Sequence, residues 1–118
     1  MLKQILLVGA GGAVGSIFRF LTSVFVTRSE PWPFPVATFF VNIIGCFCIG
    51  LFANLIPSNN LRFLMITGFC GGFTTFSTFA SENLSLINNN QLFIAVIYIV
   101  ASVIIGLGAV WLGMYITK

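Results

Sequence analysis

Charged residues are scarce in this sequence. Of its 118 residues only 6% are Asp, Glu, Lys or Arg, whereas a typical soluble domain has about 25%. With 58% hydrophobic residues and a mean hydropathy of +1.10, the chain lacks the polar residues that would cover a water-facing surface. The composition excludes an ordinary soluble domain and indicates a protein whose solvent is lipid.

Histidine is absent, and the two acidic residues are far apart in the sequence. There is no Gly-rich phosphate loop after a strand and no nucleophile with a His partner, so we expect no enzyme. The five basic residues are scattered singly, which argues against nucleic-acid binding. Cys46, Cys48 and Cys70 lie in apolar stretches without metal-ligand spacing, and we expect buried free thiols.

Uncharged runs of membrane-spanning length occupy most of the chain. Residues 31–61, 63–81 and 83–117 carry no charge, and residues 4–27 carry only Arg19. A transmembrane helix needs about 20 apolar residues, and its backbone must be hydrogen-bonded within the segment. We therefore predict an all-α integral membrane protein, one channel domain with four transmembrane helices over approximately residues 3–27, 36–55, 61–87 and 92–116.

Helix breakers and charges define the ends of these spans. Three prolines in residues 31–35 end the first span, and Trp32 between them suits an anchor at the level of the lipid headgroups. Four spans place both termini on one side of the membrane, where Lys3, Arg62 and Lys118 oppose Arg28 and the deeper Arg19 on the other side. This bias is weak, which is compatible with an antiparallel, dual-topology homodimer but does not establish one.

The third span contains the unusual sequence GFCGGFTTFSTFASE at residues 68–82. Two adjacent glycines followed by two threonines favour a break near the middle of this helix. A break frees carbonyl oxygens, and freed carbonyls at membrane depth commonly hold a cation. The alternative is that Gly68, Gly71 and Gly72 only allow close packing of helices.

Two stripes follow the same segment. Thr74, Thr78, Ser81 and Ser85 recur at helical spacing, which would place four hydroxyls on one face. A second stripe at helical spacing is aromatic and consists of Phe69, Phe73, Phe76 and Phe79. Hydroxyls and ring edges are both suitable partners for a small anion. The alternatives are hydroxyls bonded back to the preceding turn and phenylalanines that face lipid or core.

Polar residues in the other spans extend this pattern. Asn42 offers an amide at membrane depth, and Tyr98 and Ser102 share one face of the fourth span. Each could equally tie helices together by a hydrogen bond. Arg19 could attract anions to a vestibule or snorkel to the end of its helix, and Glu82 could cap or pair near the end of the polar segment.

Three motifs resemble those of the CrcB/Fluc fluoride channels. They are GGAVGSIFRF at residues 11–20, TFFVNIIG at residues 38–45 and GFCGGFTTFSTF at residues 68–79. The resemblance covers the length, the number of spans and the order of the motifs. It implies a fluoride-selective channel that exports fluoride passively, in the form of an antiparallel, dual-topology homodimer in the plasma (inner) membrane.

The resemblance also implies roles for individual residues. It assigns the fluoride pore to Asn42, Phe76, Ser77, Thr78, Phe79, Tyr98 and Ser102, with Arg19 in the vestibule. It assigns a structural sodium ion at the dimer interface to the backbone carbonyls of Gly71 and Thr74. The next turn of the polar track in the fourth span falls near Gly106, which has no hydroxyl.

One rival is a small dual-topology multidrug exporter, which also has four helices. Such an exporter needs a membrane-embedded carboxylate to exchange protons for cationic drugs, yet the first span carries Arg19 and no acid. Glu82 lies close to the end of a span, which makes it a poor candidate for that role.

Overall fold

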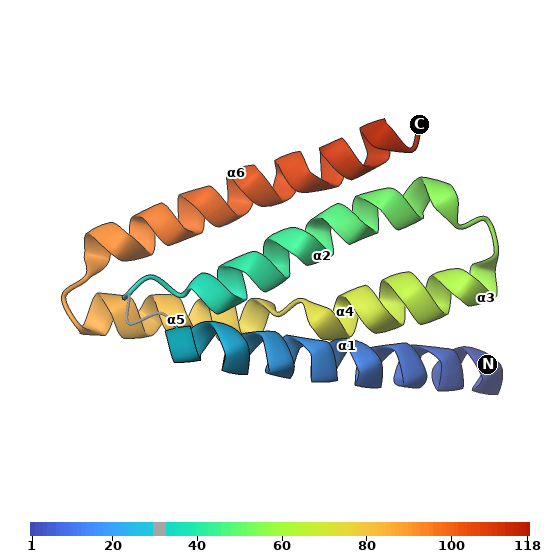
Figure 1. Cartoon of the computed structure of the whole chain (residues 1–118), viewed down its shortest axis with the longest axis horizontal. Helices are drawn as coiled ribbons and strands as arrows, with labels where there is room; N and C mark the ends of the chain where they lie inside the picture. The colour runs from blue at the N-terminus through green and yellow to red at the C-terminus, as the bar shows by residue number, and fades with distance from the viewer. Residues whose placement is uncertain (30–32) are drawn as a thin grey trace.

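The computed structural model describes residues 1–29 and 33–118, together with the side chains of all of these except residues 27–29. All regular structure in these ranges is helical (Figure 1). The elements are α1 (Leu2–Ser29), α2 (Val36–Leu55), α3 (Asn59–Arg62), the π-helix η1 (Phe63–Cys70), α4 (Gly71–Phe73), α5 (Phe76–Asn88) and α6 (Leu92–Ile116).

Four helical stretches are long and apolar enough to cross a membrane. They comprise Leu2–Val26, Val36–Leu55, Asn59–Asn88 and Leu92–Ile116, and the longest dimension of the molecule is 47 Å. The prediction of four spanning helices with a broken third helix is confirmed. The expected headgroup anchor, Trp32, lies outside the described residues.

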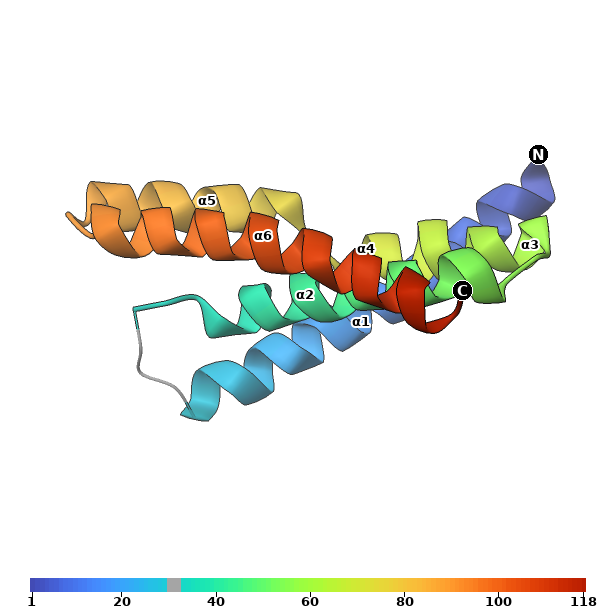
Figure 2. The same ribbon diagram turned by 90° about the horizontal axis from the view of Figure 1, so that it is seen from above.

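The helices form two packed pairs, and the third span contacts both of them. α1 packs along η1 and α4, and α2 packs along α6. Beyond α4 the third span turns away from α1, and α5 lies beside α6 instead (Figures 1 and 2). Both termini and the connection from α2 to α3 lie at the same end of the molecule, as an even number of spans requires.

Glycines allow α1 and the first half of the third span to touch through their backbones. A Cβ added to Gly15 would lie 2.2 Å from the carbonyl oxygen of Phe69, and one added to Gly72 would lie 2.5 Å from that of Gly12. Such distances exclude any side chain at either position. Small residues at helix contacts are typical of membrane proteins, where close van der Waals packing stabilises association.

The third span breaks at two threonines rather than at the glycines. Thr74 (φ −85°, ψ 160°) and Thr75 (φ −152°, ψ 119°) are extended, whereas Gly71 and Gly72 remain in α4. Both interpretations of the segment are therefore correct in part. Gly68 and Gly72 provide close packing against α1, whereas Gly71 is exposed, and the threonines provide the break.

Candidate ion pathway

The break is fixed in place by Asn42 of α2. The Asn42 side chain donates from Nδ2 to the carbonyl oxygen of Thr75 at 3.2 Å, and its Oδ1 accepts from the backbone N–H of Thr75 at 2.8 Å. The hydroxyl of Thr75 then accepts from the backbone N–H of Thr78 at 3.2 Å and caps α5. The amide of Asn42 thus satisfies the backbone N–H of Thr75, which would otherwise be unpaired at membrane depth, and adds a second donor to the carbonyl oxygen of this N-cap residue.

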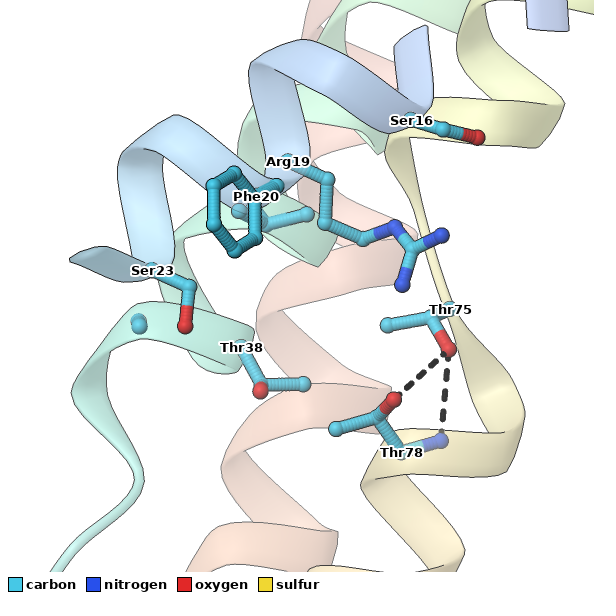
Figure 3. Close-up of a pocket in the computed structure, with 9 residues that line it drawn as sticks. Ser16, Arg19, Phe20, Ser23, Thr38, Thr75 and Thr78 are labelled. Carbon is cyan, nitrogen blue, oxygen red and sulfur yellow. Dashed lines mark hydrogen bonds between the residues drawn. The ribbon is translucent and has the colours of Figure 1, made fainter. Parts of the chain in front are cut away.

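A polar cavity of about 340 Å³ lies between α1, α2 and the start of α5. We call it the basic cavity because Arg19 is its charged residue. The Arg19 side chain extends from α1 toward Thr75 (Figure 3), and its Nε donates to the carbonyl oxygen of Gly72 at 3.1 Å. The lining is completed by Ser16, Phe20, Ser23, Ala37, Thr38, Val41, Thr75 and Thr78.

The position of Arg19 distinguishes between its two interpretations. A snorkelling arginine would direct its guanidinium along the helix to the membrane surface. Here the group is half-buried, lines the basic cavity and holds the carbonyl oxygen of Gly72, which belongs to the last turn of α4. The structure therefore favours the inward-facing interpretation.

A second cavity, of about 290 Å³, lies on the α2 and α6 side of the break. We call it the aromatic cavity, and no charged residue lines it. Phe76 and Phe79 form one wall, with ring centroids 5.7 Å apart. The ring of Phe79 also meets Tyr98 edge to face at 4.9 Å. The full lining consists of Asn42, Cys46, Ile49, Thr74, Thr75, Phe76, Phe79, Ser102 and Val103.

Thr75 lines both cavities. Thr75, at the break, thus lies between the basic cavity and the aromatic cavity. Among the described side chains, the Oγ of Ser102 in the aromatic cavity is fully buried and makes no hydrogen bond. A buried hydroxyl without a partner costs free energy, so Ser102 is an unsatisfied polar group at the edge of this cavity.

Glu82, in the middle of α5, is held by two hydroxyls. Thr38 donates to its Oε2 at 2.8 Å, and Tyr98 donates to its Oε1 at 2.8 Å. The Tyr98 side chain is completely buried. These bonds bear out the interpretation that Glu82 pairs near the end of the polar segment.

The residues singled out in the sequence divide between these places. Arg19 and Thr78 line the basic cavity, while Asn42, Phe76, Phe79 and Ser102 line the aromatic cavity. Tyr98 reaches the wall of the aromatic cavity through its contact with Phe79. Ser77 is exposed and lines neither space.

The expectation of continuous stripes along the third span is wrong. Because the chain is extended at residues 74 and 75, Thr74 does not share a helical face with Thr78, and Thr74 donates its hydroxyl back to the carbonyl oxygen of Cys70 at 2.8 Å. The aromatic stripe likewise divides into a stacked pair before the break, Phe69 and Phe73, and a tilted pair after it, Phe76 and Phe79.

Several residues that line the cavities do not stand out in the sequence. Thr75 is a candidate N-cap, because threonine is favoured at the residue that precedes a helix. Thr38 is four residues before Asn42 and so lies on the same face of α2. Ser16 and Ser23 flank Arg19 at helical spacing, which places them on the face that looks into the basic cavity.

Comparisons with known proteins identify the family of this chain. The sequence matches the family described as CrcB-like protein, Camphor Resistance (CrcB), over residues 6–114. The chain belongs to this CrcB family. Three curated relatives cover nearly the whole chain, and each is named a fluoride-specific ion channel, FluC or FluC 2.

The relatives come from distant bacteria. The protein from Flavobacterium psychrophilum is 44% identical over 99% of this chain and 98% of its own length. Those from Methylobacillus flagellatus and Rhodococcus jostii are 47% and 46% identical over 98% and 97% of this chain, and over 94% and 98% of their own lengths. The CrcB relatives are named as channels rather than enzymes, in agreement with the lack of catalytic residues in the sequence.

Proposed function

We propose that this chain is a fluoride-selective channel that lets fluoride leave the cell passively across the plasma membrane. The observation that carries the proposal is the meeting of two different cavities at Thr75, one basic and one aromatic. The names of the FluC relatives support fluoride as the ion. A small anion needs attraction before it enters the membrane and new hydrogen-bond donors once it has lost water.

The basic cavity supplies the attraction. The positively charged guanidinium of Arg19 and the hydroxyls of Ser16, Ser23 and Thr78 line the same space. Field lines in a cavity with apolar walls are focused, which raises the local concentration of anions. We assign this cavity to the vestibule.

The aromatic cavity supplies the partners for a dehydrated ion. Ring edges carry the positive part of the aromatic quadrupole, so Phe76 and Phe79 can face an anion with their edges. Asn42 uses one of its two amide N–H groups on Thr75, which leaves the second for a ligand. The hydroxyl of Ser102 is the remaining donor. We assign this cavity to the selective part of the pore, with Ser77, Thr78 and Tyr98 beside it.

We further propose that the channel is an antiparallel homodimer. The single chain leaves Phe76 78% exposed beside the break, and the hydroxyl-bearing residues Ser77 and Ser81 are exposed at membrane depth. A second copy that covers this face would remove polar groups from lipid. The numbers of basic residues at the two ends of the molecule are nearly equal, so the chain has little preference for one orientation in the membrane. Two copies in opposite orientation fit this weak bias.

The orientation can be tested with paired charge variants. Adding lysines at one end or the other should force a single orientation, because positive loops stay in the cytoplasm. We expect little fluoride efflux from either double variant alone and recovery when both are expressed together. Full efflux from each alone would contradict dual topology. The exposed positions for this test are Asn59→Lys with Asn60→Lys, and Asn88→Lys with Asn89→Lys.

A structural sodium ion fits the break. The helix ends at Phe73, and no hydrogen bond to the carbonyl oxygen of Gly71 or Thr74 occurs in the described part of the chain. Gly71 is exposed, and a Cβ there would have only the carbonyl oxygen of Ile66 nearby, at 3.9 Å. Carbonyls from two copies around a two-fold axis would supply hard oxygen ligands of the kind that this cation prefers.

Sodium should act on the assembly as well as on conduction. We expect a higher unfolding temperature of the dimer in sodium than in an equal concentration of a large organic cation. Unchanged fluoride efflux from an intact dimer after exhaustive dialysis against sodium-free buffer would contradict a structural role for sodium.

The central experiment is ion efflux from liposomes that contain the purified protein. We expect rapid efflux of fluoride without chloride, and a collapse of that efflux in Phe76→Ile and Phe79→Ile. Equal chloride efflux would leave a channel without the proposed selectivity.

The exporter hypothesis makes a different prediction for the same preparation. It requires Glu82 as a proton carrier, so Glu82→Gln would abolish transport. A channel should tolerate this change, because Gln keeps the length of the side chain and one acceptor oxygen for Tyr98 or Thr38. Proton-coupled efflux of a cationic dye that is lost in Glu82→Gln would favour the exporter.

A further inference from the structure

The aromatic cavity contains one polar side chain to which the proposed pathway assigns no role. Cys46 lines it together with Asn42, which precedes it by one turn on the same face of α2. Cys46 is a free thiol, and its sulfur makes no hydrogen bond in the described part of the chain. Ser102 lines the same cavity, and its Oγ is buried without a hydrogen-bond partner. The thiol is therefore available to an occupant of this cavity.

The opposite helix leaves room for this thiol. Ser102 is followed one turn later on α6 by Gly106, which is buried and has no side chain. A Cβ added to Gly106 would lie 3.6 Å from the Sγ of Cys46. The thiol thus borders the place where a side chain at position 106 would otherwise begin, one helical turn beyond Ser102.

We propose that the thiol of Cys46 is the hydrogen-bond donor that follows Ser102 along the fluoride pathway. Cys46 of α2 thus supplies a hydrogen-bond donor beside Gly106, the residue of α6 that has no side chain to donate one. The proposal rests on the proposed function and names a further residue of its conduction pathway. A thiol is a weak donor and otherwise resembles a small hydrophobic group. Cys46 therefore assists a small anion less strongly than a hydroxyl would.

This role predicts an order among variants of similar size. Cys46→Ser provides a stronger donor and should conduct fluoride as fast as the native protein or about threefold faster. Cys46→Ala removes the donor and should lower fluoride efflux about fivefold, with chloride still excluded. If Cys46 only packs against Gly106, Ser and Ala should give the same efflux, and that result would overturn the proposal.

Cys48 provides the matched control. It lies on α2 only two residues away, is half-buried like Cys46 and does not line the aromatic cavity. Cys48→Ser and Cys48→Ala should both conduct at the native rate. Size-exclusion chromatography of each variant would show whether a change in efflux comes from loss of folded protein.

Covalent modification tests the position of the thiol independently of substitutions. Methyl methanethiosulfonate transfers its methylthio group to the Cys46 sulfur: a new S–S bond forms, the S–SO₂ bond breaks, and methanesulfinic acid leaves with the thiol proton. We expect the added group to block fluoride efflux, and a reducing agent to restore it. The block should disappear in Cys46→Ala and persist in Cys48→Ala, with labelling of each cysteine followed by mass spectrometry.

The outcomes separate this proposal from the proposed function. If the native protein exports fluoride, but Cys46→Ala conducts normally and stays sensitive to the reagent, only the role of Cys46 is wrong. Labelling of Cys46 without loss of efflux would also overturn that role. A native protein that shows no fluoride-selective efflux would overturn the proposed function, and the role of Cys46 with it.

Discussion

The two halves of the third span differ in how they are held. Before the break, η1 and α4 press against α1 through glycines, with backbone touching backbone. After the break, α5 leaves α1 and packs on α6 through side chains such as Phe79 and Tyr98 (Figure 2). Both cavities lie where the two halves separate, and the basic one opens between α1 and α5.

This difference indicates that the two halves of the third span have different roles. Backbone contact leaves no space for a cavity and fixes the first half as a scaffold. Side-chain contact in the second half leaves hydroxyls and ring edges free to face an ion. Substitutions before the break should therefore act on folding, and substitutions after it on conduction.

The largest effect should come from the scaffold. In Gly15→Leu the new side chain begins within 2.2 Å of the Phe69 carbonyl oxygen, and we expect a loss of stability of about 3 kcal/mol or more. The unfolding temperature and the monodisperse fraction in detergent would measure it. Gly9→Leu is the matched control, because a Cβ at Gly9 has nothing within 4 Å. Equal behaviour of the two variants would contradict the scaffold role of the first half.

A smaller effect on folding, together with loss of conduction, should follow from releasing the break. Asn42→Leu leaves the backbone N–H of Thr75 without its partner and removes one donor to the Thr75 carbonyl oxygen, which costs about 1–3 kcal/mol. We expect fluoride efflux to fall at least tenfold in the protein that remains folded.

The same substitution elsewhere on α2 is the control for Asn42. Asn54 likewise makes a hydrogen bond to another helix, in this case to the carbonyl oxygen of Met114 in α6 at 2.9 Å. Unlike Asn42, it is exposed at the end of α2. Asn54→Leu should cost less than about 1 kcal/mol and leave efflux unchanged. Native efflux from Asn42→Leu would show that the clamp on the break is not needed for conduction.

Much of this architecture can be predicted from the sequence. The uncharged runs fix the number of spans, because lipid admits few charges and no unpaired backbone. The break could be located only to within a few residues. Glycine weakens a helix, yet here Gly71 and Gly72 both remain in α4, where Gly72 packs against Gly12 of α1, while Thr74 and Thr75 become extended.

The grouping of the site residues was beyond sequence reasoning. Once the helix breaks, the rotation between its halves is no longer given by helical periodicity, so Thr74 and Thr78 no longer share a face. Contacts between spans depend on tertiary packing as well. Nothing in the local sequence shows that Asn42 binds Thr75 or that Glu82 lies between Thr38 and Tyr98.

The smallest of the expected effects concerns the charge of the basic cavity. Arg19→Gln removes the positive charge while keeping an amide near the Gly72 carbonyl oxygen, which Arg19 holds at 3.1 Å in the native protein. Attraction of anions by a partly open cavity is screened by salt over about 10 Å at 0.1 M ionic strength. We expect about fivefold lower fluoride efflux at low ionic strength, and a smaller difference as an impermeant salt is added.

Two further variants distinguish attraction from a structural role of Arg19. Arg19→Lys keeps the charge and should restore most of the efflux at low ionic strength, although Lys lacks the Nε–H that bonds Gly72. Lys3→Gln removes a charge that is exposed near the end of α1, outside both cavities, and should leave efflux unchanged. A deficit in Arg19→Gln that does not depend on salt would mean that the guanidinium acts by holding the end of α4 in place. In that case Arg19 would belong to the contacts by which α1 holds the first half of the third span, and not to the attraction of anions.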